Sequence, residues 1–293
     1  MRKTLRNLLS IALFAFVLAV SWSIFRPAAS QLAANPTDYG NRLFQSHLHD
    51  RPMASDAVAQ APMQPVEAEQ VTYATVDGQP VTGYLARPAN ATESLPGLIV
   101  IHEWWGLNDN IEMMTRRLAG EGYLALAVDL FGQVADTPEQ ARAQVQAAAQ
   151  TPQKLEDNLR QAYQYLSNQQ ASKVGSIGWC FGGSWSLRTA LLLPEELDAA
   201  VIYYGGQLIT DSAQLEPLQM PILGVFGSLD DNPPVETVKA FESALKSLDK
   251  SVQVHIYEGA DHAFANPSGT RYNAEAAEDA WGKTTAFLNQ HLK

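Results

Sequence analysis

Two uninterrupted apolar runs, Gly97–Ile101 and Tyr123–Val128, constrain the fold of this chain more than any other feature. Apolar residues that continue without alternation are typical of strands buried on both faces, as in a parallel sheet. Between the two runs, Ile111, Met114 and Leu118 recur at helical spacing. Because parallel neighbours need a crossover connection, usually a helix, this stretch predicts a strand, a helix and a strand of one parallel sheet.

The same alternation continues along the chain. Val71–Val76 and Val81–Arg87 alternate around Asp77-Gly78, which predicts an opening antiparallel hairpin. Further predicted strands are Lys173–Gly178, Ala199–Tyr204, Ile222–Phe226 and Val252–Tyr257, and further predicted helices are Pro138–Ala149, Gln153–Leu166, Gly182–Leu193, Val235–Leu248 and Glu275–His291. The predicted fold class is therefore α/β, with a mostly parallel central sheet, helices on both faces and a single domain over residues 70–293.

Residues 1–30 are expected to be a targeting segment outside this domain. Arg2, Lys3 and Arg6 precede an uncharged apolar run from Leu8 to Phe25. The run is long for a signal peptide and just long enough to span a bilayer. A signal peptide cleaved after Ser30 and a retained membrane anchor both remain open, and the basic N-terminus predicts export of the remainder in either case, to the periplasm or another extracytoplasmic space.

Residues 31–69 are rich in alanine, glutamine and proline, which predicts a flexible linker. His47 and His49 lie within it, and we expect both to be solvated and not bound to a metal. This segment is interpreted as a tether between the targeting segment and the domain.

Composition excludes several classes of function. A single cysteine, Cys180, rules out an intrachain disulfide framework and a zinc site built on several thiolates. The net charge is −11, and because residues 1–30 hold four bases and no acid, the remainder carries −15. Such an acidic surface disfavours nucleic acid as a partner and favours a neutral small molecule as ligand. No metal motif is present and no cofactor is implied.

The cysteine lies in the strongest motif, Gly178-Trp179-Cys180-Phe181-Gly182-Gly183, between a predicted strand and a predicted helix. This is the nucleophile-elbow pattern with cysteine in place of serine. Glycines two residues either side of the nucleophile remove side chains that would collide in the sharp turn. The N–H groups of the following helix stabilise a thiolate and an oxyanion. The alternative is a structural cysteine packed in a glycine-rich turn.

Two further motifs supply an acid and a base in the chain order that follows a nucleophile elbow. Gly227-Ser228-Leu229-Asp230 and Gly259-Ala260-Asp261-His262-Ala263-Phe264 each come after a predicted strand. We expect His262 to move the proton of Cys180 and Asp230 to fix the tautomer of His262. Asp231 remains an alternative for the acid, since aspartate also caps loops.

These motifs, together with Ile101-His102-Glu103-Trp104-Trp105-Gly106, resemble the dienelactone hydrolases, cysteine enzymes of the α/β-hydrolase fold. The resemblance covers roughly residues 71–292. It implies a catalytic triad of Cys180, Asp230 and His262, and hydrolysis of a lactone or a small carboxylic ester through an acyl-thioester.

The resemblance implies further roles. Glu103 would accept the thiol proton when ligand binds, although a pocket-rim acid paired with an arginine is the alternative. The backbone N–H groups of Phe181 and Trp104 would form an oxyanion hole. His102 is expected to point to the opposite side and to be structural. The candidate substrate contacts are Trp105, Tyr204, Phe264 and Arg142.

One departure from the family concerns the substrate. Dienelactone hydrolases carry a carboxylate-binding arginine shortly after the His-x-Phe segment, where this chain has Asn266, and Arg142 is the counterpart of a second such arginine. The expected function is an exported cysteine hydrolase of esters or lactones, and whether it has a cationic carboxylate clamp remains open. A non-catalytic small-ligand-binding protein on the same fold, and a hydrolase of another class such as a small-peptide hydrolase, are the alternatives.

Overall fold

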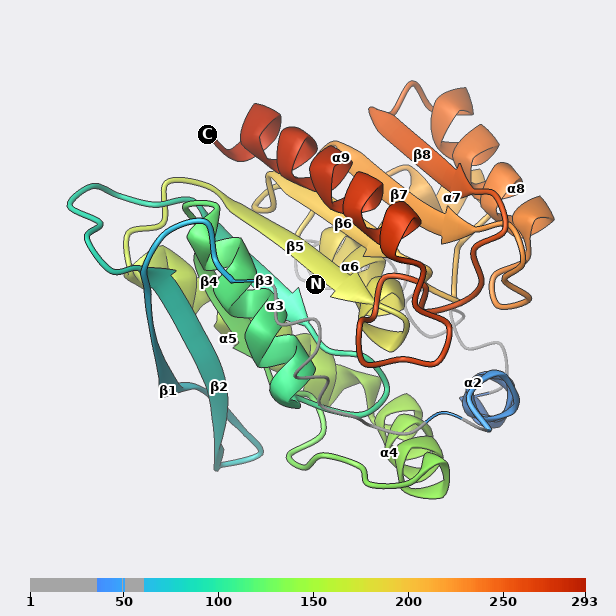
Figure 1. Ribbon diagram of the computed structural model, residues 1–293, viewed down its shortest axis with the longest axis horizontal. Coiled ribbons are helices and arrows are strands. Elements are labelled where there is room, and N and C mark those ends of the chain that lie inside the picture. Colours follow the sequence, from blue (N-terminus) through green and yellow to red (C-terminus); the bar gives the residue numbers. More distant parts are fainter. Residues whose placement is uncertain (1–35, 49, 51–60) are drawn as a thin grey trace, which may run out of the picture. The chain divides into compact units, whose positions relative to one another are not determined.

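The computed structural model describes residues 36–48, 50 and 61–293, and the predicted targeting segment lies outside this range. Within it, eight strands form one sheet in the order β1-β2-β4-β3-β5-β6-β7-β8 (Figure 1). The strands are β1 Val66–Val76, β2 Gln79–Pro88, β3 Gly97–Ile101, β4 Leu124–Val128, β5 Val174–Trp179, β6 Ala199–Tyr203, β7 Ile222–Gly227 and β8 Val252–Tyr257. Strands β1 and β2 pair in antiparallel fashion with each other, and β2 with β4, whereas the remaining pairs are parallel. The predicted fold class is confirmed.

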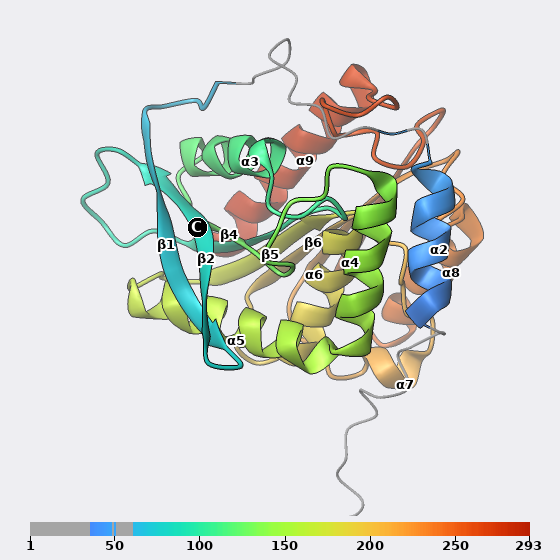
Figure 2. The same ribbon diagram turned by 90° about the horizontal axis from the view of Figure 1, so that it is seen from below.

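The helices cover both faces of the sheet. They are α2 Pro36–Ser46, α3 Asp109–Gly120, α4 Pro138–Gln150, α5 Pro152–Asn168, α6 Phe181–Leu192, α7 Ser212–Leu215, α8 Val235–Ser247 and α9 Ala274–Leu292. Figure 2 shows α3 and α9 on one side of the sheet and α5 and α6 on the other. Strands β3 to β7 are buried along their whole length, which is why their sequences are apolar apart from Ser176 of β5.

Capping residues set where several helices begin. The side chain of Asn108 accepts a hydrogen bond from the Ile111 N–H at the start of α3, and Asn273 accepts one from Ala276 at the start of α9. Such caps satisfy N–H groups that have no partner inside the helix. None of the described helices combines the length and the hydropathy needed to cross a membrane.

The structure differs from the sequence prediction in the segment interpreted as a linker. Helix α2 lies inside that segment, and its Tyr39 and Leu43 are buried, at 1% and 0% exposure. The two residues are four apart and so share one helix face, and the Tyr39 hydroxyl on that face contacts Ser184 of α6. Helix α2 itself lies beside α4 (Figure 2). Strand β1 also begins at Val66, inside the predicted linker. The prolines suggested a linker, but Pro36 opens the helix, where its missing N–H has no consequence.

The turn between β5 and α6 depends on two glycines. A Cβ on Gly178 would lie 2.1 Å from the carbonyl oxygen of Gly182, and a Cβ on Gly182 would lie 2.2 Å from that of Ile101. In both cases the nearest atoms belong to the backbone, so no flexible side chain can move aside to make room for a Cβ. Between them, Cys180 has a φ of 57°, in the left-handed region that L-residues rarely adopt. This close packing fixes the thiol at the carboxyl end of the sheet.

We expect Gly178→Ala to destabilise the fold by at least about 3 kcal/mol, because the added methyl group meets backbone that cannot yield. The matched control is Gly282→Ala in α9, where a Cβ meets nothing within 4 Å. There alanine should stabilise the helix by roughly 0.5–1 kcal/mol. Urea unfolding of both variants measures the difference, and equal stability of the two would contradict the proposed turn geometry.

Candidate active site

Cys180 lies at the carboxyl end of β5, immediately before α6, and its side chain is fully buried. Its backbone N–H donates a hydrogen bond to the Tyr203 carbonyl at the end of β6, at 3.0 Å. The thiol therefore sits where the elbow pattern predicts, above the sheet and before the first turn of a helix.

His262 and Asp230 lie on the loops that follow β8 and β7, which are neighbours in the sheet. The Nδ1 of His262 donates to Oδ2 of Asp230 at 2.9 Å, and both side chains are 1% exposed. Burial alone would lower the pKa of His262, but the charges of Asp230 and Cys180 raise it well above its ordinary value. Asp231, the alternative acid, is exposed, so the structure brings Asp230 and not Asp231 to the histidine.

A second histidine, which the sequence analysis placed in a solvated linker, contacts the thiol. His47 follows helix α2 directly and is 3% exposed, and its Nε2 lies 3.7 Å from the Cys180 Sγ. Its ring stacks on Trp104 at 4.6 Å between centroids and meets His262 edge-on at 5.0 Å. The expectation of a solvated His47 is wrong, because docking of α2 carries this residue into the site. His49 lies outside the described residues.

His47 is held in place by an ion pair. Its Nδ1 donates to Oδ2 of Asp50 at 2.6 Å, and the Arg271 guanidinium donates to the same carboxylate oxygen at 2.6 Å and to the Ser46 carbonyl at 2.7 Å. Thr270 donates to the other oxygen of Asp50. Burial opposes ionisation of Asp50, but these donors together lower its pKa to about 2. Because the Asp50 carboxylate only accepts, Nδ1 of His47 donates to it, and Nη2 of Arg271 lies 2.9 Å from the same nitrogen.

The two imidazoles decide the ionisation of the thiol. Burial would raise the pKa of Cys180, yet the charge and the hydrogen-bonding capacity of His262, followed by those of His47, lower it to about 6. A thiol with this pKa is mostly thiolate at neutral pH, which is the nucleophilic form.

Glu103 lies just after β3 and is also buried, at 3% exposure. Its Oε2 accepts a hydrogen bond from Nδ2 of Asn266 at 2.5 Å. Burial and the negative charge of Cys180 raise the pKa of Glu103 to about 8. The structure therefore pairs Glu103 with an amide and not with the arginine of the alternative interpretation.

The other predicted residues fall into two groups. Trp104 and Trp105 are buried and pack on each other, whereas Tyr204 contacts the His262 ring and Phe264 packs against Tyr204. The hydroxyl of Tyr204 is buried and has no hydrogen-bond partner among the described residues. Arg142 instead lies on α4, with its guanidinium 4.4 Å from the centre of the Phe44 ring on α2.

His102 has the structural surroundings predicted for it. Its Nε2 accepts a hydrogen bond from the Leu130 N–H at 3.1 Å, and its Nδ1 lies 2.6 Å from the Glu103 carbonyl. Both ring nitrogens are thereby used in holding the loops after β3 and β4.

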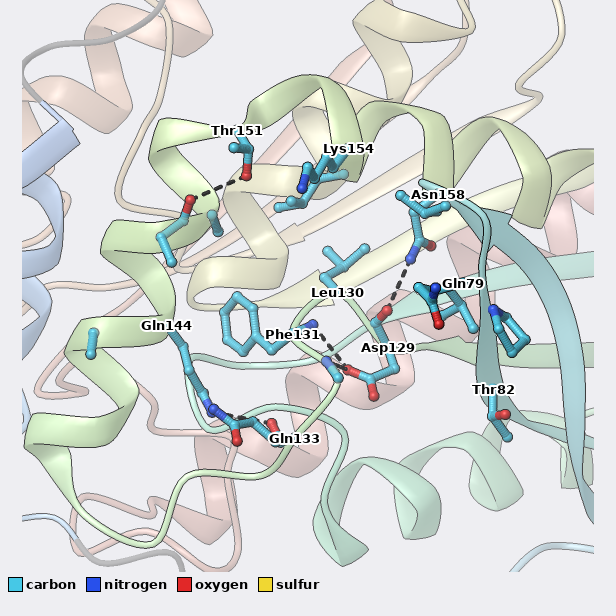
Figure 3. A pocket seen from close by; sticks show the side chains of 18 of the residues that line it. Gln79, Thr82, Asp129, Leu130, Phe131, Gln133, Gln144, Thr151, Lys154 and Asn158 are labelled. Carbon is cyan, nitrogen blue, oxygen red and sulfur yellow. Dashed lines mark hydrogen bonds between the residues drawn. The ribbon is translucent and has the colours of Figure 1, made fainter.

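Two cavities differ sharply in size. The one bounded by His47, Glu103, Trp104, Asn266 and Arg271, among other residues, has a volume of about 20 Å³, room for roughly one water molecule. A cavity of about 730 Å³ lies elsewhere, between the β1–β2 hairpin, the loop after β4 and helices α4 and α5 (Figure 3). The predicted site residues do not line it. By size alone, a ligand would be placed in the larger cavity, away from Cys180.

We expect the ultraviolet absorbance of the single thiolate to titrate with a midpoint near pH 6. In His262→Ala the main group that lowers the pKa is gone while burial remains, so the midpoint should rise above the ordinary value of about 8.5. Cys180→Ala supplies the baseline. An unchanged midpoint in His262→Ala would show that this histidine does not control the thiol.

A cysteine on a strand-to-helix elbow, with a histidine and an aspartate on the loops after the last two strands of the sheet, defines a hydrolase of the α/β-hydrolase fold. The sequence model of the dienelactone hydrolase family matches residues 81–292. The chain belongs to the dienelactone hydrolase family and is a hydrolase acting on ester bonds.

Individual relatives agree with this assignment. The protein named "Putative carboxymethylenebutenolidase" of Saccharolobus solfataricus is 33% identical over 259 residues, covering 74% of this chain and 96% of that protein. Protein usf of Aquifex pyrophilus is 32% identical, with 74% of this chain and 96% of that protein covered. Among solved structures, a dienelactone hydrolase-like promiscuous phosphotriesterase from metagenomic libraries is 26% identical with a TM-score of 0.70, covering 78% of this chain and 99% of that one.

Proposed function

We propose that this protein hydrolyses a lactone or a small carboxylic ester through a Cys180-His262-Asp230 triad and an acyl-thioester. The observation that carries the proposal is a buried thiol on the elbow, faced by a histidine whose other nitrogen is bonded to a buried carboxylate. Cys180 Sγ and a ring nitrogen of His262 lie within 4.8 Å of each other, and Asp230 bonds to Nδ1 of His262, which supports these roles.

In the first half-reaction, the Cys180 thiolate attacks the carbonyl carbon of the ester. The N–H groups of Phe181 and Trp104 are our candidates for the donors to the resulting oxyanion. His262, protonated on Nε2, gives this proton to the departing alkoxide as the carbon–oxygen bond breaks. A thioester remains on Cys180, and with a lactone the new hydroxyl stays attached to the acyl group.

In the second half-reaction, neutral His262 takes a proton from a water molecule, which attacks the thioester. The carbon–sulfur bond breaks, the carboxylic acid leaves, and the thiolate–imidazolium pair is restored. Asp230 keeps the Nδ1 proton of His262 in place during both steps, so that Nε2 remains the nitrogen that exchanges protons.

Glu103 holds a proton beside the thiol in this scheme. Its pKa of about 8 lies above the value of about 6 for Cys180, so at neutral pH the proton belongs on the carboxyl group. A neutral carboxyl avoids a repulsive negative charge next to the thiolate. The hydrogen bond from Asn266 holds this carboxyl group in position.

Substrate reaches the thiol when His47 withdraws. His47 contacts the Sγ and covers Trp104, and the adjoining cavity holds little more than one water molecule. An acyl group bonded to Cys180 needs this space. We therefore include displacement of the end of α2 in the reaction cycle.

Alkylation should abolish hydrolysis, because it blocks the proposed nucleophile. Cys180 is the single cysteine of the sequence, so no other thiol can be modified. Cys180→Ala should remove essentially all turnover while the protein stays folded, since alanine fits the space of the cysteine. A panel of chromogenic carboxylic esters, lactones and one phosphotriester, assayed before and after alkylation, measures the effect. Full activity of the alkylated protein would refute the assignment of Cys180 as the nucleophile. If the unmodified protein bound esters without hydrolysing them, a non-catalytic binding protein would be favoured.

Asp230→Asn should lower kcat by orders of magnitude, because the amide no longer fixes the tautomer of His262. Asp231→Asn is the matched control, one residue away and exposed, and should retain nearly normal kcat. Steady-state kinetics on one ester of the panel compares the two. The opposite ranking would assign the acid to Asp231.

We also propose that the domain is exported. Support comes from the basic residues Arg2, Lys3 and Arg6 before the uncharged run from Leu8 to Phe25. N-terminal sequencing of the protein recovered from an extracytoplasmic fraction tests the proposal. A start at Gln31 indicates a cleaved signal peptide, an intact leader in the membrane indicates an anchor, and recovery only inside the cell refutes export.

A further inference from the structure

Three potential metal ligands meet at the end of β5. The Cys180 Sγ and one ring nitrogen each of His47 and His262 lie within 4.8 Å of one another, and all three side chains are buried. They come from distant parts of the chain: the residue after α2, the elbow, and the loop after β8. The sequence indicated no metal site here because His47 was assigned to a solvated segment.

The two histidines are oriented as metal ligands are. Asp50 holds Nδ1 of His47 at 2.6 Å, and Asp230 holds Nδ1 of His262 at 2.9 Å. A carboxylate bonded to Nδ1 fixes the tautomer and leaves Nε2 as the ligand, an arrangement common around protein-bound metals. The Nε2 of His262 is buried and has no hydrogen-bond partner in the part of the chain that the structure describes.

The spacing suits a tetrahedral ion. With Zn–S of about 2.3 Å and Zn–N of about 2.0–2.1 Å, tetrahedral angles separate a sulfur from a nitrogen by about 3.6 Å. The distance between Cys180 Sγ and His47 Nε2 is 3.7 Å. Thiolate and imidazole together select zinc and similar ions over magnesium or calcium, which prefer oxygen ligands.

We propose that Cys180, His47 and His262 form a binding site for a thiophilic divalent cation such as Zn²⁺. A water molecule supplies the fourth ligand. The Cys180–His262 pair holds one proton, and coordination of both Sγ and Nε2 releases it to solvent. The guanidinium of Arg271 lies 2.9 Å from Nδ1 of His47, and its pairing with Asp50 offsets its positive charge.

Occupancy has two consequences. The ion takes the thiolate that would attack an ester, so metal and substrate exclude each other. It also joins His47 to the domain and thereby holds the end of α2 over the site.

Zn²⁺ binding to the full chain, in competition with a chromophoric chelator and without substrate, tests the proposal. We expect one bound equivalent. Asp50→Asn should weaken Zn²⁺ binding about 10–100-fold, because it removes the carboxylate that orients His47. His47→Ala should weaken Zn²⁺ binding more, because it removes a ligand. His255→Ala, on β8 and outside the cluster, is the matched control and should bind as the unmodified chain does. Circular dichroism checks folding, and His47→Gln replaces His47→Ala if the latter does not fold.

Co²⁺ identifies the ligands directly. Bound Co²⁺ should show a sulfur-to-cobalt charge-transfer band and the intense visible bands of a tetrahedral ion, and both should disappear in Cys180→Ser. Equal Zn²⁺ affinity of the unmodified chain and His47→Ala, or a Co²⁺ complex without a thiolate band, would overturn the proposal. Because no substrate is present, the result is independent of whether Cys180 is the nucleophile.

Discussion

The contact of backbone against backbone at the elbow is the constraint on which the site depends. Gly178 lies against Gly182, and Gly182 lies against the end of β3. This contact brings β3, β5 and the start of α6 so close that Glu103, two residues after β3, and Cys180, directly before α6, face the same small volume. Any side chain at either glycine would separate these elements. The arrangement of the site therefore requires glycine at both positions.

Charge within this volume is balanced between neighbouring protein groups. Burial disfavours every ion, so each one persists only beside a partner. The Cys180 thiolate has the two imidazoles, Asp50 has His47 and Arg271, and Glu103 stays neutral at pH 7 because its pKa is about 8. The pKa of the thiol and that of Glu103 are shifted in opposite directions by the same pocket. The pocket thus favours a thiolate beside a neutral carboxyl group, and perturbed pKa values of this kind are common at functional sites.

The local pattern of apolar residues and glycines in the sequence was sufficient to predict most of the fold and the order of the site motifs. Buried parallel strands are continuously apolar, and the elbow needs its glycines, so both features are visible in the sequence. Helix α2 has no such signature, because it is short and polar except for the face that carries Tyr39 and Leu43. Its position depends on packing against α4, which is a tertiary contact. The sequence analysis therefore missed His47, Asp50 and Arg271, although the separation of a histidine and an aspartate by three residues was a signal that could have been weighed.

Asn266 has a structural partner that its sequence position does not indicate. The sequence analysis treated it as the loss of a carboxylate-binding cation, whereas its amide donates to Glu103. A cation does border the site, since Arg271 and Asn266 line the same cavity, but its guanidinium is bonded to Asp50. The Nη atoms of Arg271 donate to Asp50 and to the Ser46 carbonyl, while its Nε is buried and has no hydrogen-bond partner among the described residues. A carboxylate that competes with Asp50 for this guanidinium would also loosen His47, because Asp50 bonds to both groups.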